Sequence, residues 1–267
     1  MLLYSGKGDV GMSYDYNKLT RKQISEAISL LKENLEQARK YYIESKEKVH
    51  VDESLLQALI QEIVKGEYAF SNELLRMLDL SLIDFSGINV TCVDFSGTNA
   101  NIDPQTVKFK SIAHTNLSGL DMSGKCFDDC CFMYTNLANT NANIEPQKIH
   151  ENSLYGVNLE NVDLSGKCFD NVCIAEANLE GTNADIDPQT VKNKILYGTN
   201  LYGLDMSDKC FDECDIREAI LIDTGANITI YDNEYYRDYI EDALMYGCNV
   251  VDKRKKFSNF IRSLRKK

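Results

Sequence analysis

An apolar residue stands at every fifth position through the middle of this chain. One stretch reads Leu117, Met122, Phe127, Phe132, Leu137 and Ala142, and the equivalent residues recur 42 positions later, from Leu159 to Ala184. The near-copies SGKCFDD, SGKCFDN and SDKCFDE follow the same 42-residue step. A period of five fits neither an α-helix, which repeats every 3.6 residues, nor a plain strand, which repeats every two. A fixed long repeat is typical of solenoids, so the pattern predicts a chain that turns once per five residues and winds into a rod.

The 42-residue step indicates four sides per coil. Two coils of four five-residue sides leave two residues over, and these fall in the loops 101–107, 143–149 and 185–191. Every fourth apolar position then stacks on the next, and about seven coils span residues 80–230. An isoleucine stands two residues after each alanine that precedes a loop. We predict that Ile144 folds inward and fills the space left beside Ala142, because protein interiors do not tolerate voids well.

A short motif recurs through the repeat, as TNLSG (115–119), TNLAN (135–139), VNLEN (157–161), ANLEG (177–181) and TNLYG (199–203). On these residues the chain resembles the pentapeptide-repeat family over roughly residues 80–228. The resemblance implies a right-handed four-sided β-helix in which the central Leu or Phe and the small residue two positions earlier point inward. Lys125, Lys167 and Lys209 depart from this pattern by standing in the small-residue position. Burial of an unpaired ammonium is costly, and the preceding Gly124 and Gly166 suggest a bulge that swings Lys125 and Lys167 outward, whereas Asp208 lacks that freedom. We expect this face to be the least regular.

The sequence divides into three parts. We expect a helical N-terminal region and cap over residues 1–79, a mainly β solenoid over 80–230, and a C-terminal helix with a basic amphipathic tail over 231–267. The apolar spacing predicts individual helices over residues 20–48, 52–66, 71–78 and 233–244. The helices next to the rod would cover its two open ends, which would otherwise template strand pairing.

Charge is distributed unevenly along the chain. The formal net charge is −12, yet residues 80–252 carry 10 Lys and Arg against 28 Asp and Glu. An acidic rod does not attract nucleic-acid phosphates, so we expect no direct nucleic-acid binding by the rod and favour a basic partner. The first residues lack the features of a signal peptide, and no apolar run is long enough to span a membrane. With nine cysteines interpreted as reduced thiols, these features predict a cytoplasmic location.

The residues predict neither catalysis nor a cofactor. The three histidines have no recognisable nucleophile partner, and the acidic residues recur with the repeat, as Asp121, Asp163 and Asp205 do. Zinc would need four convergent ligands, whereas the cysteines lie on different repeats. Asp185 and Asp187 offer fewer oxygens than calcium takes, and turn chemistry explains them. We expect no enzyme and no metal site.

The first functional hypothesis is therefore a rigid acidic scaffold that binds a protein with a basic surface. The candidate contacts are Asp128, Asp129, Asp170, Asp212 and Glu213. The second hypothesis comes from the resemblance: some pentapeptide-repeat proteins mimic duplex DNA and act on DNA gyrase, giving quinolone resistance. The helical N-terminal region and the basic tail count against it, because such mimics do not typically carry them.

The third hypothesis is membrane-surface association through the tail. Residues 253–267 carry eight Lys and Arg and no acidic residue, with apolar residues at helical spacing from Phe257 to Leu264. A basic amphipathic helix binds a membrane surface or a partner. The alternatives are packing on the protein itself or contact with the acidic rod. The candidate tail contacts are Lys253, Arg254, Lys255, Lys256, Arg262 and Arg265.

Overall fold

The computed structural model describes residues 3–4, 50–51, 75–76, 78–81, 83–230 and 243–252. Near the N-terminus, strands β1 (Leu3–Tyr4) and β2 (His50–Val51) pair antiparallel. The helices expected over residues 20–48 and 52–66, most of the one over 71–78, and the basic tail lie outside the described residues.

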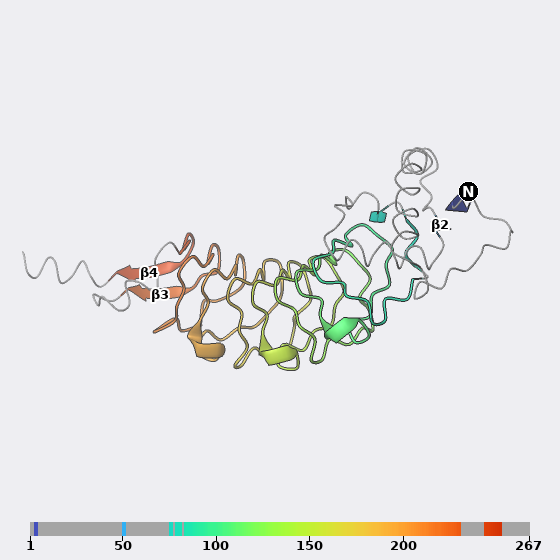
Figure 1. The fold of residues 1–267 in the computed structure, drawn as a ribbon. Helices are drawn as coiled ribbons and strands as arrows, with labels where there is room; N and C mark the ends of the chain where they lie inside the picture. Colours follow the sequence, from blue (N-terminus) through green and yellow to red (C-terminus); the bar gives the residue numbers. More distant parts are fainter. Residues whose placement is uncertain are drawn as a thin grey trace, which may run out of the picture.

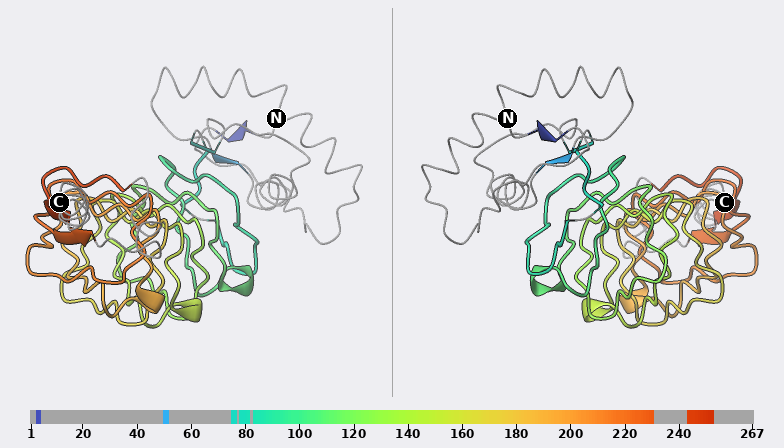
Figure 2. Two further views of the ribbon diagram at one scale, coloured as in Figure 1. Left: turned by 90° about the vertical axis from the view of Figure 1, so that its left-hand side faces the viewer. Right: turned by 90° about the vertical axis from the view of Figure 1, so that its right-hand side faces the viewer.

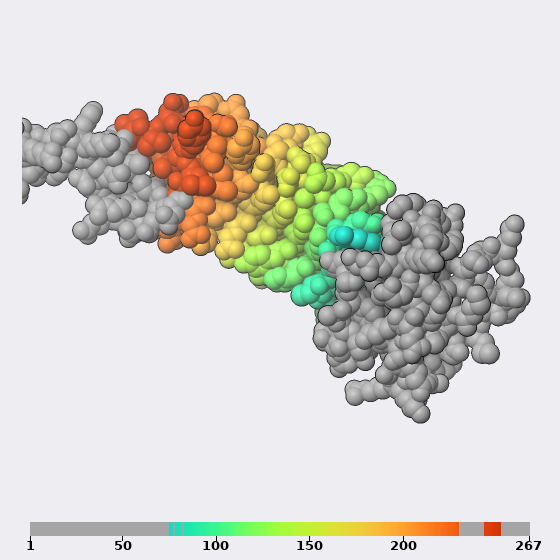
Figure 3. Space-filling view, turned by 90° about the horizontal axis from the view of Figure 1, so that it is seen from above, coloured from blue at the N-terminus to red at the C-terminus, as the bar shows by residue number. Residues whose placement is uncertain are grey.

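From residue 83 to residue 230 the chain winds around one long axis, and the windings stack in sequence order (Figure 1; Figure 3). Parallel bridges join Asn116 to Asn136, Asn136 to Asn158, Asn158 to Asn178, and Asn178 to Asn200. The bridged residues are alternately 20 and 22 positions apart. The 42-residue repeat is thus divided into two unequal windings, with the two surplus residues on every second one.

The windings surround a common axis (Figure 2). The apolar positions of the repeat are buried and form the core inside them. Leucines from successive windings form one interior row with no exposed surface: Leu117, Leu137, Leu159, Leu179, Leu201 and Leu221. Ile144 is also fully buried, next to the small Ala142, and its equivalents Ile102 and Ile186 are at most 1% exposed. The prediction that the loop isoleucine packs inward is confirmed.

Three short 3-10 helices follow the three loops: η2 (Lys108–Lys110), η3 (His150–Asn152) and η4 (Lys192–Lys194). They lie in line along one side of the rod, on alternate windings (Figure 1). The middle residue of η2, Phe109, has a φ of 60°, and its two equivalents are also left-handed. A left-handed residue redirects the backbone sharply, so each of these helices is a turn of the winding.

The windings continue past residue 230, where the sequence analysis placed the end of the solenoid. β3 (Asn227–Ile230) pairs in parallel with β4 (Asn249–Asp252), and Leu244 bridges Ile220. The helix expected over residues 233–244 lies outside the described residues up to 242. At Leu244 the chain is extended instead of helical, because its backbone N–H donates to the carbonyl of Ala219, 2.8 Å away. No helix within the described ranges is long and apolar enough to cross a membrane.

The three lysines in the small-residue position are tucked against the rod rather than swung outward. The Lys167 side chain is 15% exposed, and its Nζ lies 2.6 Å from both Asn143 Oδ1 and Glu145 Oε1 in the preceding loop. Lys209 makes the equivalent ion pair with Asp185 at 2.5 Å. The expected outward swing was wrong, because the loop one winding earlier supplies the oxygen partners that the ammonium needs.

Candidate binding surface

Three parallel rows of side chains run along one side of the rod, and every winding crosses all three within about six residues. The charged row contains the turn residues Lys108, Asp128, Asp129, His150, Glu151, Asp170, Lys192, Asp212 and Glu213. The middle row contains Ser111, Cys131, Ser153, Cys173, Ile195 and Asp215. The tyrosine row contains His114, Met133, Tyr134, Tyr155, Glu176, Tyr197, Arg217 and Glu218.

Backbone pairing holds the middle row in register. Within it, Ser111 bridges Cys131, Ser153 bridges Cys173, and Ile195 bridges Asp215. The asparagine bridges described above lie on the other side of the tyrosine row. The face with the lysines and loops carries, among the described residues, the isolated Cys210–Asn227 bridge and the β3–β4 pairing that starts at Asn227. The middle row is therefore paired within each 42-residue unit, and the asparagine row beside it is paired at every winding.

The structure brings all five predicted acidic residues into the charged row, and all five are exposed. They stand on every second winding, and the windings between them carry Lys108, His150 and Lys192 at the equivalent positions. The His150 Nδ1 lies 3.5 Å from Asp129 Oδ1. Lys194 Nζ lies 3.6 Å from Glu213 Oε2. Lys192 therefore interrupts the acidic residues of the row and Lys108 stands at its start, whereas the winding of His150 also carries the acidic Glu151.

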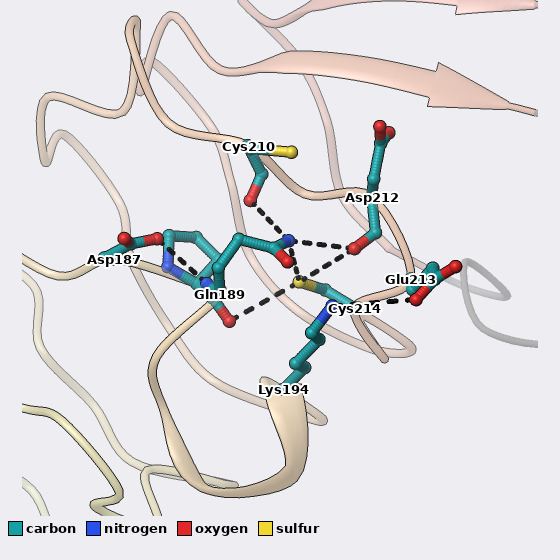
Figure 4. Close-up of polar contacts among 8 residues, drawn as sticks. Asp187, Gln189, Lys194, Cys210, Asp212, Glu213 and Cys214 are labelled. Carbon is teal, nitrogen blue, oxygen red and sulfur yellow. Dashed lines mark hydrogen bonds and ion pairs between the residues drawn. The ribbon is translucent and has the colours of Figure 1, made fainter.

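Glutamine side chains fix the backbone of the charged row from beneath. In the last repeat Gln189 Nε2 donates to the carbonyl of Asp212, 2.8 Å away, and to that of Cys210, 3.1 Å away (Figure 4). The buried Cys214 thiol lies 3.5 Å from the carbonyl of Pro188. Burial raises the pKa of this thiol to about 12, so it stays protonated and inert. These groups support the row, and they do not form a reactive site.

The tyrosine row is held by contacts between side chains on different windings. The ring of Tyr134 stacks on His114, with ring centroids 5.0 Å apart, and meets Tyr155 edge-on at 5.3 Å. Both tyrosine hydroxyls donate to Glu176, Tyr155 to Oε1 at 2.6 Å and Tyr134 to Oε2 at 3.1 Å. The hydrogen bond to Glu176 raises the pKa of Tyr155 well above its usual value. Two phenols therefore share one carboxylate on the surface.

Gly156 makes this arrangement sterically possible. Its φ is +66°, and a Cβ atom at this position would lie 2.4 Å from the Tyr134 ring. The glycine therefore lets Tyr134 lie across the intervening winding and reach Glu176, 42 residues further along the chain.

The tyrosine row was not predicted from the sequence. Its signal is present in the printed sequence, because Tyr155 and Tyr197 are one repeat apart and Tyr134 follows an apolar repeat centre. Met133 and Tyr134 are 43% and 40% exposed, large fractions for residues of this size. Tyr, Met and Arg are enriched in the cores of protein interfaces, so this row is the stronger candidate for protein contact.

Within the described residues, no group of three or more His, Cys, Asp or Glu side chains is arranged to hold a metal ion. All nine cysteines are free thiols. The six tail residues predicted to contact a membrane or a partner lie outside the described residues.

This chain is only weakly similar to solved protein structures. No protein-family model matches the chain, and no curated protein matches it. A solved pentapeptide repeat protein from the thylakoid lumen of Arabidopsis thaliana is 17% identical, with 66% of this chain and 83% of that chain covered and a TM-score of 0.14. Full-length QnrB1, a plasmid-mediated fluoroquinolone resistance protein, is 16% identical, with 65% and 86% covered and a TM-score of 0.18. Scores this low carry no argument about function.

Proposed function

We propose that this protein is a non-enzymatic scaffold that binds a protein partner with a basic surface. In this proposal, residues from about 80 onward form a right-handed four-sided β-helix of about seven coils. The 20- and 22-residue bridge spacing and the stacked interior leucines support that architecture. Such a rod keeps its outward side chains at fixed positions, so a partner meets a preorganised surface.

The observation that carries the proposal is the exposed tyrosine row beside the charged row. Met133, Tyr134 and Tyr155 supply apolar area, and the phenol–carboxylate hydrogen bonds to Glu176 hold the two tyrosines in place. Large side chains that are ordered before binding lose little conformational entropy in a complex. The carboxylates of both rows favour a partner that presents Lys or Arg.

A pair of matched tyrosines tests the proposal. Tyr134 and Tyr202 are each 40% exposed, but Tyr202 lies outside the three rows. Immobilised full-length protein is incubated with cell lysate, and retained proteins are compared among wild type, Met133→Ala/Tyr134→Ala and Tyr202→Ala. We expect a protein that the wild type and Tyr202→Ala retain and that the double variant loses. High salt should weaken its retention, because screening shortens the reach of charge. Equal retention by all three proteins, or no retained protein, contradicts the proposal.

No observation favours action on DNA gyrase over this function. A duplex mimic needs a continuous negative face, whereas Lys192 interrupts the acidic residues of the charged row between Asp170 and Asp212. A supercoiling assay with micromolar protein addresses gyrase directly, and we expect neither inhibition nor protection.

A further inference from the structure

One repeat of the tyrosine row contains its own guanidinium. Arg217 makes a bidentate pair with Asp215, with Nε 2.8 Å from Oδ1 and Nη2 2.6 Å from Oδ2. Its guanidinium carbon lies 5.6 Å from the centre of the Tyr197 ring. The Tyr197 hydroxyl donates to Glu218 Oε1 at 3.1 Å. A ring, a guanidinium and two carboxylates thus form one compact surface group.

The preceding repeat has the same ring and carboxylate without the guanidinium. Tyr155 and Glu176 stand 42 residues before Tyr197 and Glu218, and the phenol–carboxylate hydrogen bond is kept at 2.6 Å. Ala175 replaces the arginine. Cys173 replaces the aspartate that pairs with it. The earlier repeat therefore carries two short uncharged side chains at the positions where the later repeat carries Arg217 and Asp215.

The earlier repeat also keeps unused capacity for a cation. Each oxygen of Glu176 accepts one phenol hydrogen bond, and a carboxylate oxygen has a second lone pair. None of the ion pairs between described residues involves Glu176. The charge of Arg217 partly opposes the upward pKa shift of Tyr197.

We propose that Tyr155 and Glu176 bind an arginine side chain supplied by a protein partner. Its guanidinium would lie over the Tyr155 ring as that of Arg217 lies over Tyr197, and would pair with Glu176 in place of the Asp215 carboxylate that the earlier repeat lacks. The inference rests on the proposed function and names the chemistry by which the partner is recognised. A planar guanidinium stacks on a phenol ring and forms fixed hydrogen bonds to a carboxylate, which the ammonium of lysine does less well. Tyr134 extends the aromatic surface next to the bound group.

The test uses two fluorescent peptides of equal charge, hexa-arginine and hexa-lysine, with the full-length protein at physiological salt. We expect hexa-arginine to bind roughly tenfold more tightly, because stacking on an aromatic ring is worth on the order of 1 kcal/mol. The variant Ala175→Arg/Cys173→Asp copies the next repeat and leaves the net charge unchanged. It should fill the site from within and reduce hexa-arginine binding to the level of hexa-lysine.

The reciprocal variant provides the matched control. Arg217→Ala/Asp215→Cys empties the later repeat, so it should add a second arginine site and raise the measured stoichiometry. Glu176→Gln keeps the size of the side chain and removes its charge. This variant tests the arginine site if Ala175→Arg/Cys173→Asp does not fold. Equal affinity for both peptides that no variant changes would overturn the arginine site. That result leaves the scaffold proposal intact, since the lysate experiment tests it separately.

Discussion

At the scale of single residues, the size of a side chain determines how well it fills the interior of the rod. Ala142 is too small to fill its interior position, and the fully buried Ile144 supplies the missing volume from the loop. The loop therefore contributes to the core, as the position of its isoleucine predicted. Nearby Lys148, in contrast, is exposed.

Ile144→Ala should destabilise the protein by about 2–5 kcal/mol, because it leaves a cavity beside Ala142 that the rigid windings cannot close. The matched control, Lys148→Ala in the same loop, should change the free energy of unfolding by less than about 0.5 kcal/mol. Urea unfolding followed by circular dichroism measures both. Similar values for the two variants would show that the isoleucine does not support the core.

At the scale of the structural element, hydrogen bonds between neighbouring windings help to lower the pKa values of outward acidic residues. Asn141 donates to Asp121 Oδ1 at 2.7 Å, while its own Oδ1 accepts the backbone N–H of Met122 at 2.6 Å. Asn183 repeats this arrangement with Asp163. The amide of Asn141 lowers the pKa of Asp121 to about 2. For Asp163 the backbone N–H of Ser165 is the largest cause, again giving a pKa of about 2.

A carboxyl group with a lowered pKa in the folded state stabilises the protein above its unfolded pKa. That contribution is lost as the pH falls toward the folded pKa. The free energy of unfolding should therefore decrease between about pH 4 and pH 2. Asn141→Ala should raise the pKa of Asp121 toward its usual value and leave that of Asp163 near 2. NMR titration of the side-chain carboxyls measures both in one sample. An unchanged Asp121 would show that the asparagine does not control it.

At the scale of the whole molecule, each winding contacts mainly its neighbours in sequence (Figure 3). Two windings form one complete 42-residue unit, so residues one unit apart have equivalent surroundings. Asn158 and Asn200, for example, occupy the same position in the bridged asparagine row. The stability of such repeat structures is approximately a sum of unit and interface contributions.

Deletion of residues 143–184 removes one complete unit and joins Ala142 to Asp185. We expect this shortened protein to fold, with an unchanged far-UV circular dichroism shape and a modestly lower Tm, because every interior row keeps its order. Deletion of residues 143–182 removes 40 residues and shifts the later positions by two. We expect this second protein to be less stable, because it joins Asn136 and Asn200 by a winding about two residues too long for the observed bridge spacing of 20 and 22. Equal Tm values for the two would contradict a 42-residue unit.

The sequence predicted the interior packing correctly, but it did not predict contacts between neighbouring windings at Lys167 and Leu244. The stacking of Leu117 and Leu137 and the burial of Ile144 followed from the apolar period alone. Lys167 was misjudged, since its partners Asn143 and Glu145 lie in the preceding winding. Leu244 was misjudged because the apolar spacing before it resembles a helix, while its backbone pairs with the previous winding.

The sequence by itself determined the period of the winding and the identity of the interior rows. A side chain that recurs at a fixed spacing must point to the same side of the coil. Where that side is the interior, the available space limits the size of the side chain. Only the tertiary structure decided which outward side chains meet. Tyr134 and Glu176 are 42 residues apart and come together because Gly156 leaves room between their windings. Such contacts depend on side-chain length and direction across neighbouring windings, which no local pattern records.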